Sequence, residues 1–111
     1  MGNLKLTSLE EAIMLSILGT PRYGQDIVDV VSKASNGHYQ LDPGTLYPAL
    51  HRLKRRGLIQ EKKIEDKQVY EELIIRRGHN RRYYKVSPEG KNILSEIDRI
   101  RLQIRAHPCS S

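Results

Sequence analysis

Three stretches in the first half of the chain carry apolar residues at the three- and four-residue spacing of a helix that buries one face. The first begins after two overlapping capping boxes in residues 7–11, TSLEE, and runs to about residue 18. The second covers residues 23–35 and ends at the Asn-Gly pair that follows. The third lies in residues 42–56, DPGTLYPALHRLKRR, and ends at the next glycine. Between the second and the third, residues 38–41 alternate and predict a short strand.

The third helix contains Pro48, and the sequence leaves open where this helix starts. A start near Thr45 puts the proline in the first turn, where backbone N–H groups have no partner within the helix. A start at Pro43 instead deletes one hydrogen bond from the helix. On the face away from the leucines, small and flat residues come first and cations follow within residues 52–56. Such a face suits a polyanion, and an α-helix fits the major groove of B-DNA.

The second half of the chain begins with the two-residue alternation of strands. Residues 58–65 and 81–86 predict two paired strands, with a long insert, EDKQVYEELIIRRGHN, between them. The insert has its best turn signal at residues 78–80, and residues 69–75 suit an extra strand, a lengthened hairpin arm or a short helix. Arginine on a hairpin tip can enter a minor groove or hold phosphates. Four arginines bracket the turn: Arg76, Arg77, Arg81 and Arg82.

A last helix is predicted from Pro88, with Ser87 as its N-cap, to about residue 107. Isoleucines repeat along it at spacings of four, three and four, which is the seam of a short coiled coil. This seam either folds back on the domain or pairs with a second copy of the chain. Two heptads are too short to hold a dimer alone, so the first helix is expected to share the interface. The residues assigned to the dimer are Leu9, Ile13, Ile93, Ile97, Ile100 and Ile104.

Composition and charge narrow the range of functions. A chain of 111 residues allows one compact domain, and its single cysteine, Cys109, excludes an intramolecular disulfide, which favours a cytoplasmic protein. The chain has no apolar run long enough to span a membrane and no basic-then-apolar secretory signal. The net charge of +6 is concentrated in residues 51–91, which hold thirteen Lys and Arg against six Asp and Glu. Clustered cations favour a polyanionic partner, because neutralising phosphates releases counterions.

Signatures of enzyme and metal sites are absent from the sequence. It contains no phosphate loop, no dinucleotide-binding glycine pattern and no pair of cysteines. The histidines fall in different predicted elements, without the spacing of metal ligands: His38, His51, His79 and His107. We therefore predict no catalytic residue, no metal and no cofactor, and an enzyme is disfavoured.

The order of the predicted elements is that of a winged helix-turn-helix with a dimerisation arm. The expected fold is mainly α with a small β-hairpin. Residues 1–87 are predicted to form the winged helix domain, with an extended wing at about 58–86. Residues 88–107 are predicted to form the C-terminal dimerisation helix, and residues 108–111 a tail.

The chain resembles the PadR-like transcriptional regulators in three segments. These are LG and YG within residues 18–24, GTLYPALHRL and GLI within residues 44–59, and RRYYKVSPEG at residues 81–90. The resemblance implies a homodimeric repressor of a near-palindromic operator, with the third helix in the major groove and the wing beside it. It also implies that the last helix pairs with its mate and with the first helix.

Two features depart from the family pattern. The wing insert is longer than the common form. Some short relatives use a tryptophan on the last helix to bind planar drugs in a pore at the dimer interface, and this chain has no tryptophan. The sequence therefore identifies no small-molecule effector. The compact size and long basic wing are also similar to the circadian period-extender (Pex) branch of the family, which acts on a clock-gene promoter.

The predicted contacts with DNA divide into base reading and phosphate binding. Base edges are assigned to Thr45, Tyr47 and His51. Phosphates are assigned to Tyr23, Arg52, Lys54, Arg55 and the four wing arginines. The expected partners are double-stranded DNA and a second copy of the chain. Three alternatives stay open: repression of a clock-gene promoter, a response to a small molecule, and a winged helix that docks an acidic protein without specific DNA binding.

Overall fold

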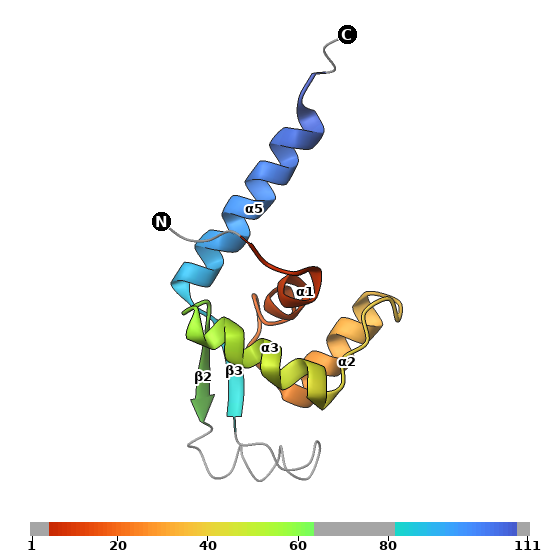
Figure 1. Cartoon of the computed structure of the whole chain (residues 1–111), viewed down its shortest axis with the longest axis vertical. Helices are drawn as coiled ribbons and strands as arrows, with labels where there is room; N and C mark the ends of the chain where they lie inside the picture. Colours follow the sequence, from red (N-terminus) through yellow and green to blue (C-terminus); the bar gives the residue numbers. More distant parts are fainter. Residues whose placement is uncertain (1–4, 64–81, 109–111) are drawn as a thin grey trace.

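The computed structural model describes residues 5–63 and 82–108, and it is elongated, with extents of 61 × 32 × 23 Å. Short helices and a small sheet form the body of the molecule, and one long helix projects from it (Figure 1). The described elements, in chain order, are α1 (Ser8–Ser16), β1 (Arg22–Tyr23), α2 (Gly24–Ala34), α3 (Pro43–Arg55), β2 (Ile59–Lys63), β3 (Arg82–Val86) and α5 (Pro88–Ala106). This is the mainly helical arrangement with a small sheet that the sequence predicts.

Local hydrogen bonds set the first residues of α1 and α5. Helix α1 uses the first of the two predicted capping boxes. The Thr7 hydroxyl accepts from the Glu10 N–H at 3.0 Å, and the Glu10 carboxylate accepts from the Thr7 N–H at 2.9 Å. The Ser87 hydroxyl caps α5 by accepting from the Gly90 N–H at 3.0 Å, and Pro88 is its first residue, as predicted.

Helix α3 starts at Pro43, which decides the question that Pro48 raises in the sequence. Asp42 caps the helix, because its carboxylate accepts from the Thr45 N–H at 2.8 Å. Pro48 then lies inside the helix and lacks the N–H that would donate to the Gly44 carbonyl. Both Gly44 and Pro48 are exposed, so the missing bond lies on the outer face of the helix.

Helix α3 ends in two hydrogen bonds that turn the chain into strand β2. The Gly57 N–H donates to the Lys54 carbonyl, and the Leu58 N–H donates to the Leu53 carbonyl, both at 3.0 Å. This turn holds Gly57 at a φ of 74°, a conformation that glycine adopts without steric cost. Because Leu53 and Leu58 are both buried, the chain leaves the helix and enters the strand within the core.

The sheet is antiparallel, with the strand order β1-β3-β2. Strands β2 and β3 confirm the predicted hairpin arms and pair Ile59 with Val86 and Glu61 with Tyr84. Strand β1 is only two residues long and pairs its Tyr23 with Tyr83 of β3. The sequence prediction missed β1 and placed Tyr23 in the second helix, since two residues are too few to show an alternation.

The predicted strand at residues 38–41 is wrong, because this segment bends between α2 and α3 without pairing to the described strands. The Ser35 hydroxyl accepts from the Tyr39 N–H at 3.0 Å, which holds the bend. Leu41 is buried and Tyr39 packs against the core. The alternation in the sequence therefore reflects two core contacts and not a strand. The wing insert, with its predicted turn and the segment at residues 69–75, lies outside the described residues.

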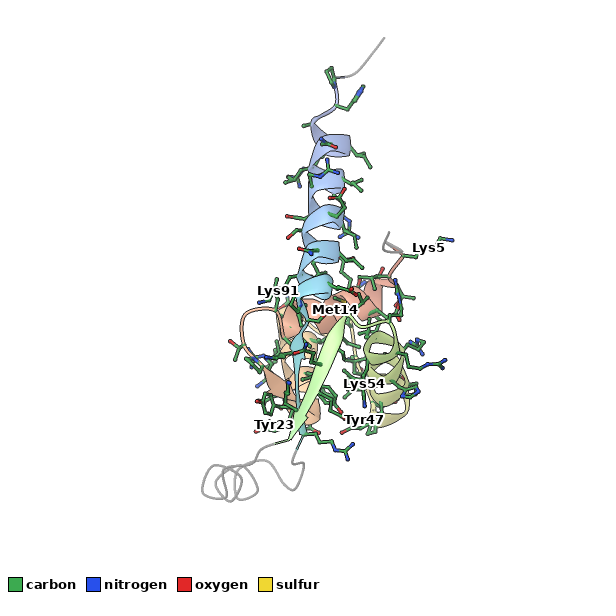
Figure 2. All side chains as sticks on the ribbon, turned by 90° about the vertical axis from the view of Figure 1, so that its left-hand side faces the viewer. Lys5, Met14, Tyr23, Tyr47, Lys54 and Lys91 are labelled. Atoms are coloured by element: carbon green, nitrogen blue, oxygen red, sulfur yellow. The ribbon has the colours of Figure 1, made fainter. Side chains whose placement is uncertain are left out.

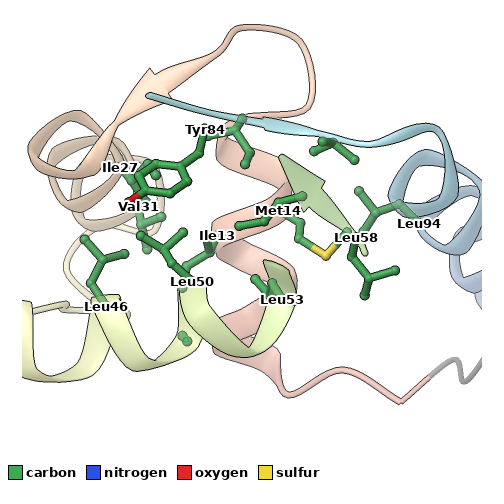
Figure 3. Close-up of a cluster of buried hydrophobic side chains, with 14 of the residues drawn as sticks. Ile13, Met14, Ile27, Val31, Leu46, Leu50, Leu53, Leu58, Tyr84 and Leu94 are labelled. Carbon is green, nitrogen blue, oxygen red and sulfur yellow. The ribbon is translucent and has the colours of Figure 1, made fainter. Parts of the chain in front are cut away.

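Side chains from the helices and the sheet pack together in one hydrophobic core (Figure 3). Figure 3 shows leucines of α3 facing α1, α2 and the sheet, and Leu94 closing the core from α5. The largest fully buried side chains are Ile13, Met14, Ile17, Ile27, Leu46, Leu53 and Leu58. From residue 101 onward, every described residue is exposed. The first part of α5 is thus built into the domain, and its last part extends beyond it.

Candidate nucleic-acid interface

Helix α3 presents one face to the core and the opposite face to solvent. Its buried positions recur at helical spacing and are Leu46, Ala49, Leu50 and Leu53. All three predicted base-reading residues lie on the exposed side: Thr45, Tyr47 and His51. Figure 2 shows Tyr47 and Lys54 on the α3 side of the molecule, far across the view from Lys91.

Tyr47 is 43 % exposed, and its hydroxyl packs next to Gly24 at the start of helix α2. A β-carbon on Gly24 would lie 2.7 Å from the Tyr47 hydroxyl oxygen, so a larger residue there must displace the ring. The absence of a side chain on Gly24 thus leaves room for the ring of Tyr47. The two residues come from separate motifs in the sequence, and the fold brings them into contact.

A carboxylate connects the C-terminal part of α3 to the hairpin. Glu61 of β2 accepts from Lys54 Nζ at 2.9 Å and from the Arg82 guanidinium at 3.4 Å. The Tyr84 hydroxyl donates to the same carboxylate at 3.2 Å. Lys54 and Arg82 therefore lie on the same side of the molecule. The helix and the base of the hairpin share one surface, which we call the cationic face; it comprises Tyr47, His51, Lys54, Arg55 and Arg82.

The titration of this cluster follows from its contacts. The hydrogen bond from Lys54 holds the pKa of Glu61 below its ordinary value of 4.5, although burial opposes this effect. Burial raises the pKa of Tyr84, and the negative charge of Glu61 raises it further. At neutral pH the carboxylate is ionised and the tyrosine stays a neutral donor.

His51 and Arg55 are exposed on α3, and we find no hydrogen bond or ion pair from either side chain to another residue in the described ranges. Arg52 differs from them, because its guanidinium donates to the buried Glu10 carboxylate at 3.3 Å. Sequence reasoning missed this ion pair between α3 and α1. Arg56 is also engaged at this end of the helix, donating to the Lys5 carbonyl at 2.8 Å.

Among the residues predicted to bind phosphates, one is buried and three lie outside the described residues. Tyr23 is only 8 % exposed and lies in strand β1, so its burial argues against the predicted phosphate contact. Arg76, Arg77 and Arg81 lie outside the described residues.

The residues assigned to a dimer separate into two groups. Ile13 and Ile93 are buried in the chain's own core, which argues against their assignment to an interface. The physical reason is that α1 packs against α2 and α3, and α5 packs against β3. Leu9, Ile97 and Ile100 are half-buried, whereas Ile104 is 72 % exposed.

The residues predicted to form the dimer did not include three leucines that are exposed in the structure, Leu15, Leu18 and Leu102. Leu15 and Leu18 of the α1 region line a groove of about 480 Å³ against α5. Across this groove, the Arg101 guanidinium of α5 donates to the Glu11 carboxylate of α1. Leu15 and Leu18 are three residues apart on the outer side of the apolar face of the first predicted helix. This spacing was the sequence signal that could have identified them.

Metal binding and membrane insertion would each require other features. Within the described ranges, no group of three or more His, Cys, Asp or Glu side chains is placed to hold a metal ion. No described helix combines the length and the apolar character that crossing a membrane requires.

Comparison with known proteins identifies the family. The family model described as "Transcriptional regulator PadR-like family" matches residues 14–96. The chain belongs to the PadR-like family. It is 31% identical to a PadR-like transcription factor from Bacteroides fragilis, whose X-ray structure matches with a TM-score of 0.68 over 87% of this chain and 82% of that one. It is also 36% identical over 68 residues to the transcriptional regulator Rv3488 of Mycobacterium tuberculosis, which is 60% of this chain and 53% of that protein.

Membership confirms the resemblance seen in the sequence: this PadR-like protein is a transcriptional regulator with a winged-helix fold, and not an enzyme. The circadian clock associated protein Pex from Anabaena is a more distant neighbour. It is 25% identical, with a TM-score of 0.54 over 91% of this chain and 85% of that one. A role at a clock-gene promoter stays a prediction.

Proposed function

We propose that this PadR-like regulator represses transcription by binding a near-palindromic operator as a homodimer. Helix α3 enters the major groove, and the hairpin lies beside it on the phosphate backbone. The observation that supports this best is the convergence of Lys54 from α3 and Arg82 from β3 on Glu61. It orients the helix and the hairpin toward the same side, as one duplex requires.

The side chains of the cationic face suit two kinds of contact. Tyr47, His51 and Thr45 are exposed on the solvent-facing side of α3 and are the candidates for contacts with base edges. Lys54, Arg55 and Arg82 carry the charge that phosphates neutralise, and Arg52 has a side chain that is more than half exposed despite its ion pair. The wing arginines outside the described residues extend the same assignment.

The dimer in this proposal uses the part of α5 that the body does not cover. Leu102 and Ile104 are exposed there, and Leu15 and Leu18 are exposed beside the groove between α1 and α5. Burying these apolar side chains against a second copy would stabilise a dimer. In this division of labour, residues 1–87 read DNA with the wing at about 58–86, residues 88–107 dimerise, and residues 108–111 form a tail.

The test is to select bound fragments from random duplex DNA and to determine the symmetry of the selected sites. We expect two inverted half-sites separated by about one helical turn, since a two-fold dimer places its reading helices that far apart. A selection that enriches no sequence would contradict DNA reading and would favour a module that docks an acidic protein. Enrichment of single, unpaired half-sites would contradict the dimer only.

A variant of the reading helix sharpens this test. We expect His51→Ala to reduce discrimination between operator and random DNA by about 1–3 kcal/mol for each base edge that His51 reads. His38→Ala is the matched control, because His38 is exposed in the segment between α2 and α3 and is not part of the cationic face. Equal reductions in affinity on operator and random DNA for His51→Ala would show that His51 reads no base.

A further inference from the structure

Glu61 places a negative charge in the middle of the cationic face. A surface that serves only to attract phosphates gains nothing from a carboxylate between its cations. A role for Glu61 therefore rests on the proposed DNA binding and concerns how that binding is made selective.

The carboxylate of Glu61 is fully engaged by its neighbours. One oxygen accepts from Lys54 Nζ at 2.9 Å, and the other accepts from Arg82 at 3.4 Å and from the Tyr84 hydroxyl at 3.2 Å. The Glu61 side chain is only 18 % exposed, whereas those of Lys54 and Arg82 are each 51 % exposed. An ammonium group has three donors and a guanidinium has five, and each cation gives one of them to Glu61 in these bonds.

We propose that Glu61 is a specificity-determining residue, which lowers affinity for DNA of any sequence and holds Lys54 and Arg82 in the geometry that the operator requires. The first effect is electrostatic: the carboxylate neutralises part of the charge that a phosphate meets at this point of the face. The second is positional, because one acceptor joins a cation of α3 to a cation of the hairpin. Glu61 acts through these two side chains and does not itself contact DNA.

The two effects differ between operator and random DNA. The affinity of a non-specific complex depends on the number of phosphates neutralised, so the Glu61 carboxylate weakens it. Such a complex also samples many registers, so cations held in one orientation strengthen it little. In the operator complex, base contacts set the register, and cations that are already oriented lose less conformational freedom on binding. The carboxylate thus weakens random binding more than operator binding.

The test compares Glu61→Gln with wild type on the selected operator and on random duplex DNA, across a series of salt concentrations. We expect random-DNA affinity to rise by about five- to tenfold at physiological salt, and the salt slope to steepen by about 0.9, as one more phosphate is neutralised. Operator affinity should change by less than about threefold, because the poorer orientation of the cations offsets their greater net charge. Asp29→Asn, on α2 and outside the proposed DNA and dimer surfaces, is the control with the same change in charge and should leave both affinities unaltered.

A second variant separates charge from structure. Glu61→Asp keeps the charge on a shorter side chain, so its random-DNA affinity should stay within about threefold of wild type. A rise equal to that of Glu61→Gln would overturn the electrostatic role. If Glu61→Gln weakened both complexes equally with an unchanged salt slope, the carboxylate would only brace the fold, and the proposal would fail. A wild-type protein without affinity for any DNA would instead refute the proposed function itself.

Discussion

Gly90 shows at the scale of one residue how tightly α5 is joined to the body. A β-carbon built on Gly90 would overlap the Leu58 carbonyl oxygen and lie 2.7 Å from a methyl group of Val86. The backbone of Leu58 is held in turn, because its carbonyl accepts from the Ser87 N–H at 3.0 Å. Neither neighbour is the end of a flexible side chain, so this close approach has little room to relax.

We therefore expect Gly90→Ala to lower the free energy of unfolding by about 3 kcal/mol, at the upper end of what overpacking costs. Thermal or urea unfolding followed by circular dichroism measures this change. Gly19→Ala is the matched control, since a β-carbon there meets no atom within 4 Å, and it should change stability by less than about 0.5 kcal/mol. Similar destabilisation by both variants would show that helix α5 does not pack on Leu58 in this way.

The same close approach explains part of the family motif. The resemblance rests partly on Ser87 and Gly90, three residues apart, and on Leu58 after α3. In the structure these residues together hold the start of α5 against the turn that follows α3. From the sequence, Ser87 was predictable as a cap because its partner is three residues away. The requirement for Gly90 was not, because Leu58 is distant in the chain.

At the scale of an element, α3 contains a proline at an interior position, where proline weakens a helix. Pro48 lies in the interior of a helix that starts at Pro43, and it removes the hydrogen bond to the Gly44 carbonyl. We expect Pro48→Ala to raise the free energy of unfolding by roughly 1–2 kcal/mol, because the restored bond outweighs the greater freedom of the unfolded chain.

Pro43→Ala provides the comparison for Pro48→Ala. Pro43 is at the first position of the helix, where an N–H has no partner within the helix, so this change should stay within about 0.5 kcal/mol. Chemical denaturation of the two variants measures both values. Equal effects would mean that Pro48 breaks no helical hydrogen bond.

Helix α5 divides into a buried and an exposed part, and its exposed part tests the dimer. Ile104 has no cover in the single chain, and burying an isoleucine contributes about 1.5–3 kcal/mol. We expect Ile104→Asp to weaken the dimer at least about tenfold while leaving thermal unfolding of the body unchanged. Sedimentation equilibrium measures the dissociation constant.

Gln103→Asp is the control for Ile104→Asp, because it adds the same charge at the neighbouring exposed position, off the isoleucine seam. A dimer that Ile104→Asp leaves intact would contradict the assignment of this seam. A dimer weakened equally by both variants would point to charge and not to apolar burial.

At the scale of the whole molecule, the basic segments are brought to one side although they are far apart in the chain. Lys54 and Arg82 meet at Glu61, so the charges of these two residues act as one field in this region. We expect Arg82→Ala to weaken binding to all DNA sequences and to flatten the salt slope by about 0.9, the value for one phosphate contact.

Lys33→Ala removes the same charge from the end of α2 and should leave that slope unchanged. Titrations of a labelled duplex at several salt concentrations measure the slope for both variants. A slope that Arg82→Ala does not alter would remove the base of the hairpin from the interface.

The local features of this protein could be predicted from the order of its residues alone. The starts of α1 and α5 depend on hydrogen bonds that the Thr7 and Ser87 hydroxyls accept from N–H groups three residues away, and the end of α3 depends on Gly57. The inner and outer faces of α3 follow from its periodicity in the same way. Such features need only neighbours in the chain, so the pattern of residues is enough to predict them.

The choice of distant partners came instead from the packing of the folded chain. Strand β1 exists because β3 lies next to it. Ile13 and Ile93 belong to the core because α1 packs against α2 and α3, and α5 packs against β3. The ion pair of Arg52 with Glu10 joins residues 42 positions apart, and Arg82 reaches Glu61 across 21. A charge or an apolar side chain has no intrinsic preference for one partner among many, so its partner follows from the packing that brings the two together.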